Sequence, residues 1–230
     1  MSNVVIIPAR GGSKRIPRKN LKFFLGKPII AYSIKAALEA NIFDEVMVST
    51  DDVEIAEIAK KYGASVPFLR STKNSDDYAT TYDVINEVIN CYKERQREFD
   101  YTCCLYPTAP FVSPEQLIKA FNLLKKDNTD GVLTVTPYSY PIQRSLSLDE
   151  TNFIKMNSQE HLKTRSQDLK ESYHDVGQFY FYKTKRYLEK KSIFNMRCKP
   201  IILSEMEAQD IDNEVDWQLA ELKYKLIKSN

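Results

Sequence analysis

The sequence lacks an apolar run long enough to cross a membrane, and it begins with strand-like residues rather than with a signal peptide. We therefore expect a cytoplasmic protein with no membrane partner. It also has little excess charge, because 33 Lys and Arg residues oppose 31 Asp and Glu residues. Proteins that bind nucleic acids usually carry a basic excess or a basic stripe, so this balance argues against a nucleic-acid partner.

Cysteine and histidine are scarce, and they lack the spacing that a metal site or a catalytic nucleophile would need. The four cysteines, Cys91, Cys103, Cys104 and Cys198, have no metal-ligand spacing. Cys103 and Cys104 are adjacent in a strand-like segment and should point to opposite faces, so we expect buried free thiols in a reducing compartment. With two histidines and no Ser/His/Asp arrangement, we expect no protein nucleophile.

Apolar runs that are typical of strands alternate with amphipathic patterns that are typical of helices. This alternation predicts one α/β domain over residues 1–230, with a mainly parallel sheet covered on both faces. The expected strands are residues 4–7, 45–49, 65–69, 101–105, 131–136, 177–182 and 200–203. The expected helices are residues 28–40, 53–62, 80–94, 114–125 and 214–227.

The alternation stops between residues 138 and 173, where the sequence is polar and shows no clear period. A structureless segment of this length is unusual inside a compact domain. Either it folds against something else, such as a partner subunit, or it is a mobile surface loop. The sequence pattern leaves both interpretations open.

A basic loop follows the first predicted strand. It contains the bend Gly11-Gly12-Ser13 among five cations, Arg10, Lys14, Arg15, Arg18 and Lys19. Converging backbone N–H groups and fixed positive charge are typical of a polyphosphate site. The spacing matches neither a P-loop nor a dinucleotide fingerprint. A solvated basic loop is the alternative, but ligands gather where the strands of an α/β sheet end, which favours a site.

Two carboxylates, Asp210 and Asp212, precede the last predicted helix. In an extended segment, residues two apart point to the same side, so both can face one cation. Few hard oxygen ligands suit a Mg²⁺ ion that keeps water and is completed by substrate phosphates. The alternative is that Asp212 or Asn213 caps the helix.

Three further segments carry polar groups at predicted strand or helix ends. Residues 105–110 contain two prolines that would fix the backbone beside a base or sugar, although they could equally form a simple turn. Residues 75–81 open a helix and could either cap it or hold a ligand. His174 lies beside Asp175. The adjacent carboxylate favours a functional role for this histidine over the structural role that is usual for a lone histidine.

Four motifs, in order, resemble a known family. IPARGGSKRIPRKN (residues 7–20), VSTDD (48–52), LYPTAPF (105–111) and DIDNEVDW (210–217) resemble the cytidylyltransferases that activate nonulosonic acids, the CMP-sialic acid synthetase family. The resemblance covers nearly the whole chain. It implies a three-layer α/β/α Rossmann-like nucleotidyltransferase that forms a homodimer through an arm at residues 138–176. It further implies transfer of CMP from CTP to a sugar acid, with Mg²⁺ as cofactor and release of pyrophosphate.

The resemblance also assigns roles to residues. It implies that Asp210 and Asp212 hold the metal, and that Arg10, Lys14 and Lys19 carry catalysis by stabilising phosphate charge. The nucleotide-binding residues that it implies are Arg10, Gly11, Gly12, Ser13, Lys14, Lys19, Asn20, Arg70, Ala79 and Thr81.

The sugar-binding segments depart from the sialic acid pattern. Tyr106 stands where a Gln is typical, and residues 173–180 replace a Phe-Arg-Pro-Asn-Gly stretch. These segments resemble the pseudaminic acid branch of the family. That resemblance implies sugar-binding residues Tyr106, Tyr173, His174, Asp175, Gln178 and Tyr180. Neuraminic, legionaminic or keto-deoxy-octulosonic acid remains an alternative substrate. More distant alternatives are a metal-dependent nucleotide-sugar glycosyltransferase and a non-catalytic nucleotide-binding module.

Overall fold

A six-stranded sheet forms the centre of the computed structural model, which describes residues 1–126 and 128–229. The strand order is β10-β6-β9-β5-β1-β4. β1 pairs in parallel with β4 and β5, and β10 with β6, whereas β9 is antiparallel to both of its neighbours. The strands are β1 (Asn3–Pro8), β4 (Glu45–Ser49), β5 (Tyr101–Leu105), β6 (Gly131–Pro137), β9 (Tyr173–Lys183) and β10 (Cys198–Ile202).

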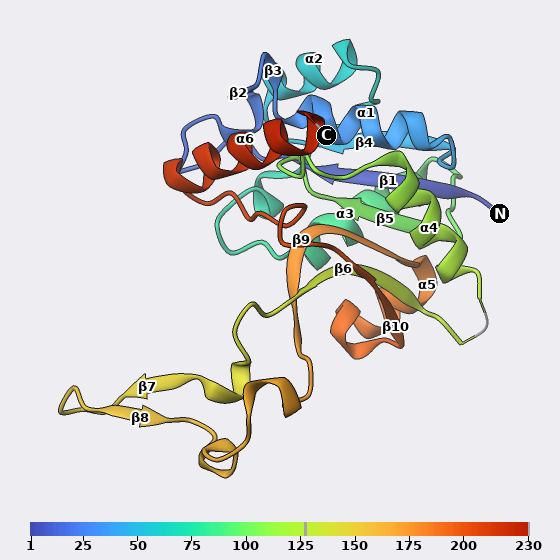
Figure 1. The fold of residues 1–230 in the computed structure, drawn as a ribbon. Coiled ribbons are helices and arrows are strands. Elements are labelled where there is room, and N and C mark those ends of the chain that lie inside the picture. Colours follow the sequence, from blue (N-terminus) through green and yellow to red (C-terminus); the bar gives the residue numbers. More distant parts are fainter. Residues whose placement is uncertain (127, 230) are drawn as a thin grey trace.

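Helices cover both faces of this sheet, which confirms the three-layer α/β/α fold (Figure 1). One face packs against α1 (Ile30–Ala40), α2 (Val53–Lys61) and α4 (Pro114–Leu124). The other face packs against α3 (Thr81–Glu94) and α5 (Thr184–Lys190). Adjacent Cys103 and Cys104 lie in the two opposite core clusters, as the strand alternation predicts.

The last helix, α6 (Glu214–Ser229), packs outside the main layers. Its Trp217 is buried in a third cluster with Phe24 and Tyr32, beside the short hairpin of β2 (Phe23–Phe24) and β3 (Lys27–Pro28). Ile211 belongs to the same cluster, so the packing of α6 also fixes the segment before it. Among the described residues, no helix has the length and apolarity needed to cross a membrane.

The structure corrects several sequence predictions. The expected strand 65–69 is reduced to a single bridge, in which Ser65 pairs with β4 at the sheet edge; Pro67, which has no N–H, follows two residues later. α5 was not predicted, and β9 begins at Tyr173 rather than at residue 177. Cys91 and Cys198 are free but only partly buried, so they are not the fully buried thiols expected.

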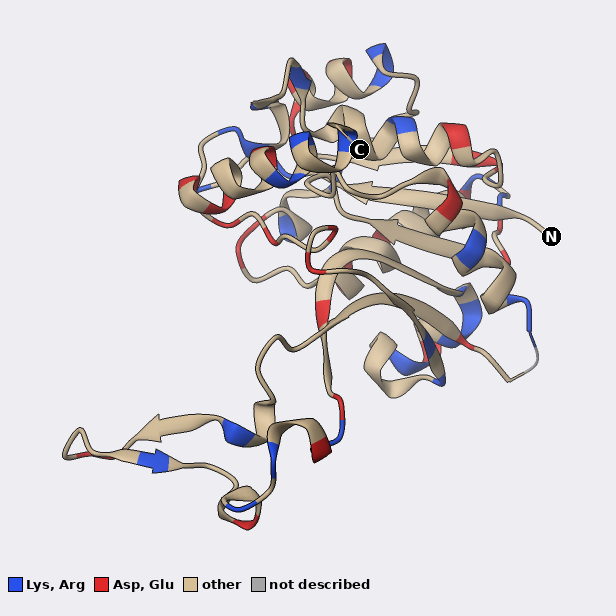
Figure 2. Ribbon diagram, viewed as in Figure 1, with Lys and Arg blue, Asp and Glu red and all other residues tan. Residues whose placement is uncertain are grey.

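Residues 138–172 form an arm that projects away from the sheet (Figure 1). Its outer part is a hairpin of β7 (Leu146–Leu148) and β8 (Ile154–Met156). Most of the hairpin is uncharged (Figure 2), and large apolar side chains on it are exposed. The short 3₁₀ helices of the chain are Lys19–Leu21, Thr72–Asn74, Ile142–Arg144, Gln159–His161, Ser166–Asp168 and Ile193–Asn195.

Candidate functional site

A cleft of about 440 Å³ lies where parallel strands β1 and β5 end. Because parallel strands point the same way, the loops after them meet at one edge of the sheet. The basic loop after β1 forms one wall of the cleft and the segment after β5 forms the other. The polar side chains that line it are Arg10, Ser13, Lys14, Arg15, Lys19, Asn20, Asp77, Tyr106 and Thr108.

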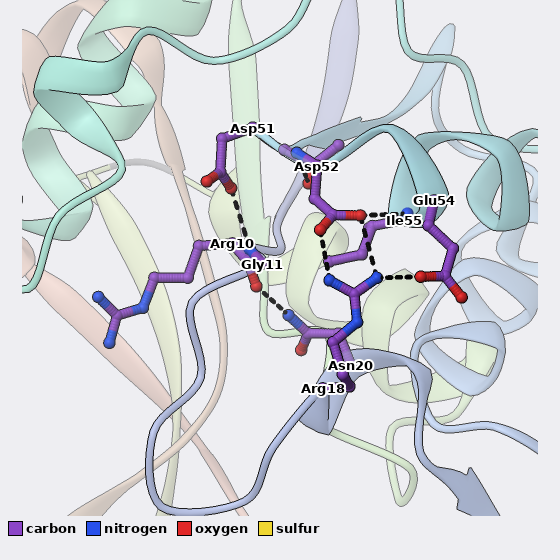
Figure 3. A network of polar contacts seen from close by, with 9 residues as sticks. Arg10, Gly11, Arg18, Asn20, Asp51, Asp52, Glu54 and Ile55 are labelled. Carbon is purple, nitrogen blue, oxygen red and sulfur yellow. Dashed lines mark hydrogen bonds and ion pairs between the residues drawn. The ribbon is translucent and has the colours of Figure 1, made fainter.

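The basic loop is held in shape by contacts at its two ends (Figure 3). The Gly11 N–H donates to Asp51 Oδ1 at 2.9 Å, and Asn20 Nδ2 donates to the Arg10 carbonyl at 3.0 Å. A Cβ atom on Gly11 would lie 2.7 Å from Asp52 Oδ2 and 3.0 Å from Asp52 Cβ, so a larger residue would displace the Asp52 side chain from this position. These contacts hold the loop in one conformation, which argues against the alternative of a solvated basic loop.

Arg18 braces the loop and takes no part in the cleft. Its guanidinium pairs with Asp52 and Glu54 of the α2 N-terminus, whereas the Arg10 guanidinium points away from this network (Figure 3). Asp52 also caps α2 by accepting the Ile55 N–H at 3.0 Å. The hydrogen bond from Arg18 is the main cause that lowers the pKa of Asp52.

The cations of the cleft face two carboxylates. Arg10 NH1 lies 2.7 Å from Asp77 Oδ1, and Lys14 pairs with the other oxygen of Asp77. Arg15, which also lines the cleft, pairs with Asp212 at 2.7 Å. The cleft thus holds a cluster of exposed and partly buried positive charges, which is what a polyphosphate requires.

Lys19 is the most buried lysine of the cleft, with its side chain 20% exposed. Its Nζ donates to the Ile211 carbonyl at 2.7 Å and lies 3.9 Å from Asp212 Oδ1. Burial is the largest effect on its pKa, which is lowered, although Asp212 and Asp210 oppose that shift. Lys19 therefore ties the basic loop to the carboxylate segment before α6.

Asp210 and Asp212 lie close enough to influence each other. Burial, and then the charge of Asp212, raise the pKa of Asp210. The helix cap is made by Asn213, whose Oδ1 accepts the N–H groups of Val215 at 2.9 Å and Asp216 at 3.1 Å. The capping alternative therefore holds for Asn213. Asp212 pairs with Arg15 through both of its carboxylate oxygens, so a metal at this pair would have to displace Arg15.

The donor set fits a hard divalent cation that is completed by other ligands. Two neighbouring carboxylates are the kind of oxygen ligands that Mg²⁺ takes from a protein. Within residues 1–126 and 128–229, no group of three or more His, Cys, Asp or Glu side chains is arranged as a metal site. Substrate phosphates and water would have to supply the remaining ligands.

A second cavity, of about 310 Å³, adjoins the cleft at Tyr106. The Tyr106 hydroxyl lies 3.0 Å from Thr81 Oγ1, and its ring meets Tyr180 edge-on with centroids 5.9 Å apart. The Tyr180 hydroxyl donates to Asp175, and its pKa is raised, chiefly by burial. The walls also include Tyr82, Tyr182, Tyr187, Ser192, Ile193 and Phe194.

Sequence reasoning missed most of these cavity walls. The signal for Tyr182 was present, because Tyr180 and Tyr182 alternate on one face of β9 while Phe179 and Phe181 face the opposite core. Tyr187 gave no such signal, since it lies on the unpredicted helix α5.

The predicted site residues that line neither cavity include Arg70, Gln178 and Ala79. Arg70 is buried beneath the end of β4, where its Nε donates to Ser49 Oγ at 3.0 Å. Gln178 is buried and donates to the Glu207 carbonyl. Ala79 donates its N–H to Asp76 at 2.8 Å, in the loop that carries Asp77.

Tyr173 and His174 lie at the base of the arm and line neither cavity. Tyr173 donates to Glu171, and the His174 ring packs 4.9 Å from Tyr138. The structure does not bring this pair together with the other predicted sugar-binding residues of the same chain.

Comparisons with known proteins show the family to which the chain belongs. The sequence profile of a family described as cytidylyltransferase matches residues 4–228. A pseudaminic acid cytidylyltransferase of Campylobacter jejuni is 45% identical over 98% of this chain and 97% of the relative. A CMP-N,N'-diacetyllegionaminic acid synthase of Legionella pneumophila is 38% identical over 100% of this chain and 98% of the relative.

The fold has solved counterparts as well. The structure of a CMP:2-keto-3-deoxy-manno-octonic acid synthetase complexed with CTP superimposes with a TM-score of 0.70 at 17% identity, covering 100% of both chains. The sequence match over almost the whole chain, together with the cation cleft and the carboxylate pair, leads to one conclusion. The chain belongs to the cytidylyltransferase family, within the enzymes that activate nonulosonic acids.

Proposed function

We propose that this enzyme transfers CMP from CTP to the anomeric hydroxyl of pseudaminic acid and releases pyrophosphate. The observation that carries the proposal is the junction of two cavities at Tyr106, one cationic and one lined by tyrosines. The cations of the first cavity suit a triphosphate, and the aromatic and hydroxyl groups of the second suit a sugar acid. The similarity to a pseudaminic acid cytidylyltransferase over nearly the whole chain supports this substrate.

The residues suit a displacement at phosphorus. Attack by a sugar hydroxyl on the α-phosphate spreads negative charge over phosphate oxygens and the departing pyrophosphate. Arg10, Lys14 and Lys19 provide positive charge at the cleft, so catalysis relies on positioning and charge stabilisation. The protein need not supply a nucleophile for this reaction.

We propose further that Asp210 and Asp212 hold Mg²⁺. When bound, the ion would neutralise phosphate charge and lower the pKa of a hydroxyl that it coordinates. The two residues hold the cation, while Lys19 keeps their segment against the basic loop through the Ile211 carbonyl.

The tyrosine cavity favours an acylated sugar acid. Rings of Tyr106, Tyr180 and Tyr182 give it an apolar surface that methyl-bearing acyl groups can contact. The Tyr106 and Thr81 hydroxyls add polar groups at the boundary with the cleft. This mixture suits pseudaminic acid better than an unacylated keto-deoxy-octulosonic acid.

Pyrophosphate release tests the function directly. The protein is incubated with CTP, Mg²⁺ and one acid at a time: pseudaminic, legionaminic, N-acetylneuraminic or keto-deoxy-octulosonic acid. We expect the highest kcat/KM with pseudaminic acid. A higher value with another acid would reassign the substrate, and turnover of a preformed nucleotide sugar without pyrophosphate from CTP would indicate a glycosyltransferase instead.

We also propose that the chain works as a homodimer in the cytoplasm. Exposed apolar side chains on the arm, including Leu148, Phe153 and Ile154, support a partner surface, because soluble proteins seldom expose such groups together. The arm leaves the sheet at the edge where the cleft lies, so a second copy could reach the site. Free thiols in a CTP-dependent enzyme fit a reducing compartment.

A further inference from the structure

We propose that Asp77 is an internal counterion that competes with substrate phosphates for Arg10 and Lys14, and so promotes the release of pyrophosphate. The inference rests on the proposed function, because it concerns the same cleft. It assigns a role to a carboxylate that neither the motifs nor the metal proposal uses.

The two oxygens of Asp77 engage two different cations. Oδ1 accepts from Arg10 NH1 at 2.7 Å, and Oδ2 accepts from Lys14 Nζ. The same Arg10 nitrogen donates to the Asp76 carbonyl at 2.9 Å. Asp77 thus bridges the cations as an oxygen pair of a phosphate would, and it lines the cleft.

The surrounding loop holds Asp77 in this position. The Asp76 carboxylate accepts the N–H groups of Tyr78 at 2.9 Å and Ala79 at 2.8 Å, which makes a tight turn. Thr80 and Asp83 then form a capping box that starts α3. The turn and the cap together fix the backbone on both sides of Asp77.

Asp77 differs in this respect from Asp212, which pairs with cations of the cleft but does not line it. Asp212 pairs with Arg15 and Lys19 and lies beside Asp210, with which it would ligate the proposed Mg²⁺. The contacts of Asp77 are with Arg10 and Lys14. A phosphate that binds these two cations must displace the carboxylate or lie against it, and like charges repel.

This competition has opposite consequences at the two ends of the reaction. It weakens the binding of CTP, but it also weakens the hold on pyrophosphate, whose phosphates leave the same cations. When pyrophosphate leaves, the Asp77 carboxylate can again form its ion pairs with Arg10 and Lys14. Removing its charge should therefore tighten polyphosphate binding and make pyrophosphate a stronger product inhibitor.

The test compares Asp77→Asn with Glu57→Gln, which removes the same charge from the exposed surface of α2. Calorimetry measures the binding of inorganic tripolyphosphate and pyrophosphate at low and at high salt. We expect Asp77→Asn to bind both about 10-fold more tightly at low salt, with a smaller gain at high salt. Glu57→Gln should bind like the wild type.

Turnover adds a second readout. For Asp77→Asn the inhibition constant of pyrophosphate and the KM for CTP should both fall, while the KM for the sugar acid stays unchanged. Asp77→Glu keeps the charge and should keep wild-type affinity; a thermal melt verifies that each variant is folded.

Unchanged or weaker tripolyphosphate binding by Asp77→Asn would overturn the inference, and so would equal tightening by Asp77→Glu. Tripolyphosphate contains neither cytidine nor sugar. Failure to turn over any sugar acid would thus count against the proposed function without altering this result.

Discussion

Lys19 shows how a single side chain can join two parts of the site. It is largely buried, contacts the Ile211 carbonyl and lies near Asp212. We expect Lys19→Ala to lower kcat by about 10²- to 10³-fold, because it removes one preorganised donor for the developing charge. The KM for the sugar acid should change little.

Steady-state kinetics with CTP and the sugar acid varied separately measures this effect. Lys19→Arg, which keeps the charge, serves as the control and should retain more activity. An equal loss in kcat and in sugar affinity would contradict the assigned role.

Asp52 carries a stability contribution that depends on pH. Because Arg18 lowers its pKa in the folded state, this contribution is complete above the ordinary value near 3.8 and disappears as pH falls through the lower folded value. We expect Asp52→Ala to cost about 1 kcal/mol for the lost cap and up to about 1 kcal/mol for the ion pair. Asp52→Asn should keep the cap and lose only the pair.

Urea unfolding at several pH values measures both variants against the wild type. The difference between wild type and Asp52→Asn should be constant near neutral pH and vanish below the folded pKa. A difference that persists in strong acid would mean that the ion pair is not its cause.

The sequence predicted only part of what the cations of the basic loop and the residues before α6 do. The pattern of charges indicated a basic loop without distinguishing its cations, whereas the family resemblance gave roles to Arg10 and Lys14 and none to Arg18. The structure places Arg10 and Lys14 in the cleft and Arg18 against α2. That distinction depends on which carboxylates the fold places nearby, and Asp52 and Asp77 come from distant loops. The cap on α6 was likewise ambiguous until Asn213 was seen to make it.

At the scale of elements, α6 supports the carboxylate segment through aromatic packing, to which both Trp217 and Tyr224 contribute. Trp217 is 2% exposed, shares a cluster with Ile211 and lies under Lys22, whose Nζ is 4.5 Å from the ring. We expect Trp217→Ala to destabilise the protein by about 3–5 kcal/mol and to reduce activity, because Ile211 loses its support.

Thermal and urea unfolding measure the first effect, and pyrophosphate release at a permissive temperature measures the second. Trp217→Phe should recover most of the stability. Full activity of folded Trp217→Ala would show that α6 does not position the carboxylates.

The alternation of strands and helices predicted most elements, because each has its own apolar period. The direction of β9 was not predictable in this way. β9 is antiparallel since the chain leaves the sheet at Pro137, traverses the arm and returns at Tyr173 beside the strand it left. Strand direction is thus a property of the path of the chain, and local composition does not contain it.

At the scale of the whole molecule, the arm determines the proposed assembly. We expect the wild type to have a solution mass of twice 26.7 kDa, and Leu148→Glu combined with Ile154→Glu to be monomeric. Both side chains are mostly exposed on the hairpin, so the charges should not disturb the core. Light scattering after size exclusion measures the mass.

Leu226→Glu, at an exposed leucine of α6, is the matched control and should leave the mass unchanged. A monomeric wild type, or a dimeric double variant, would argue against assembly through the hairpin.

The pairing of Pro137 with Tyr173 makes the arm a modular insertion. Its two ends are neighbours in the sheet, so the distance between them is fixed whatever the number of residues that connect them. The entropic cost of a longer connection grows only slowly with its length. A segment inserted at this point can therefore differ in length and in sequence without altering the register of the central sheet.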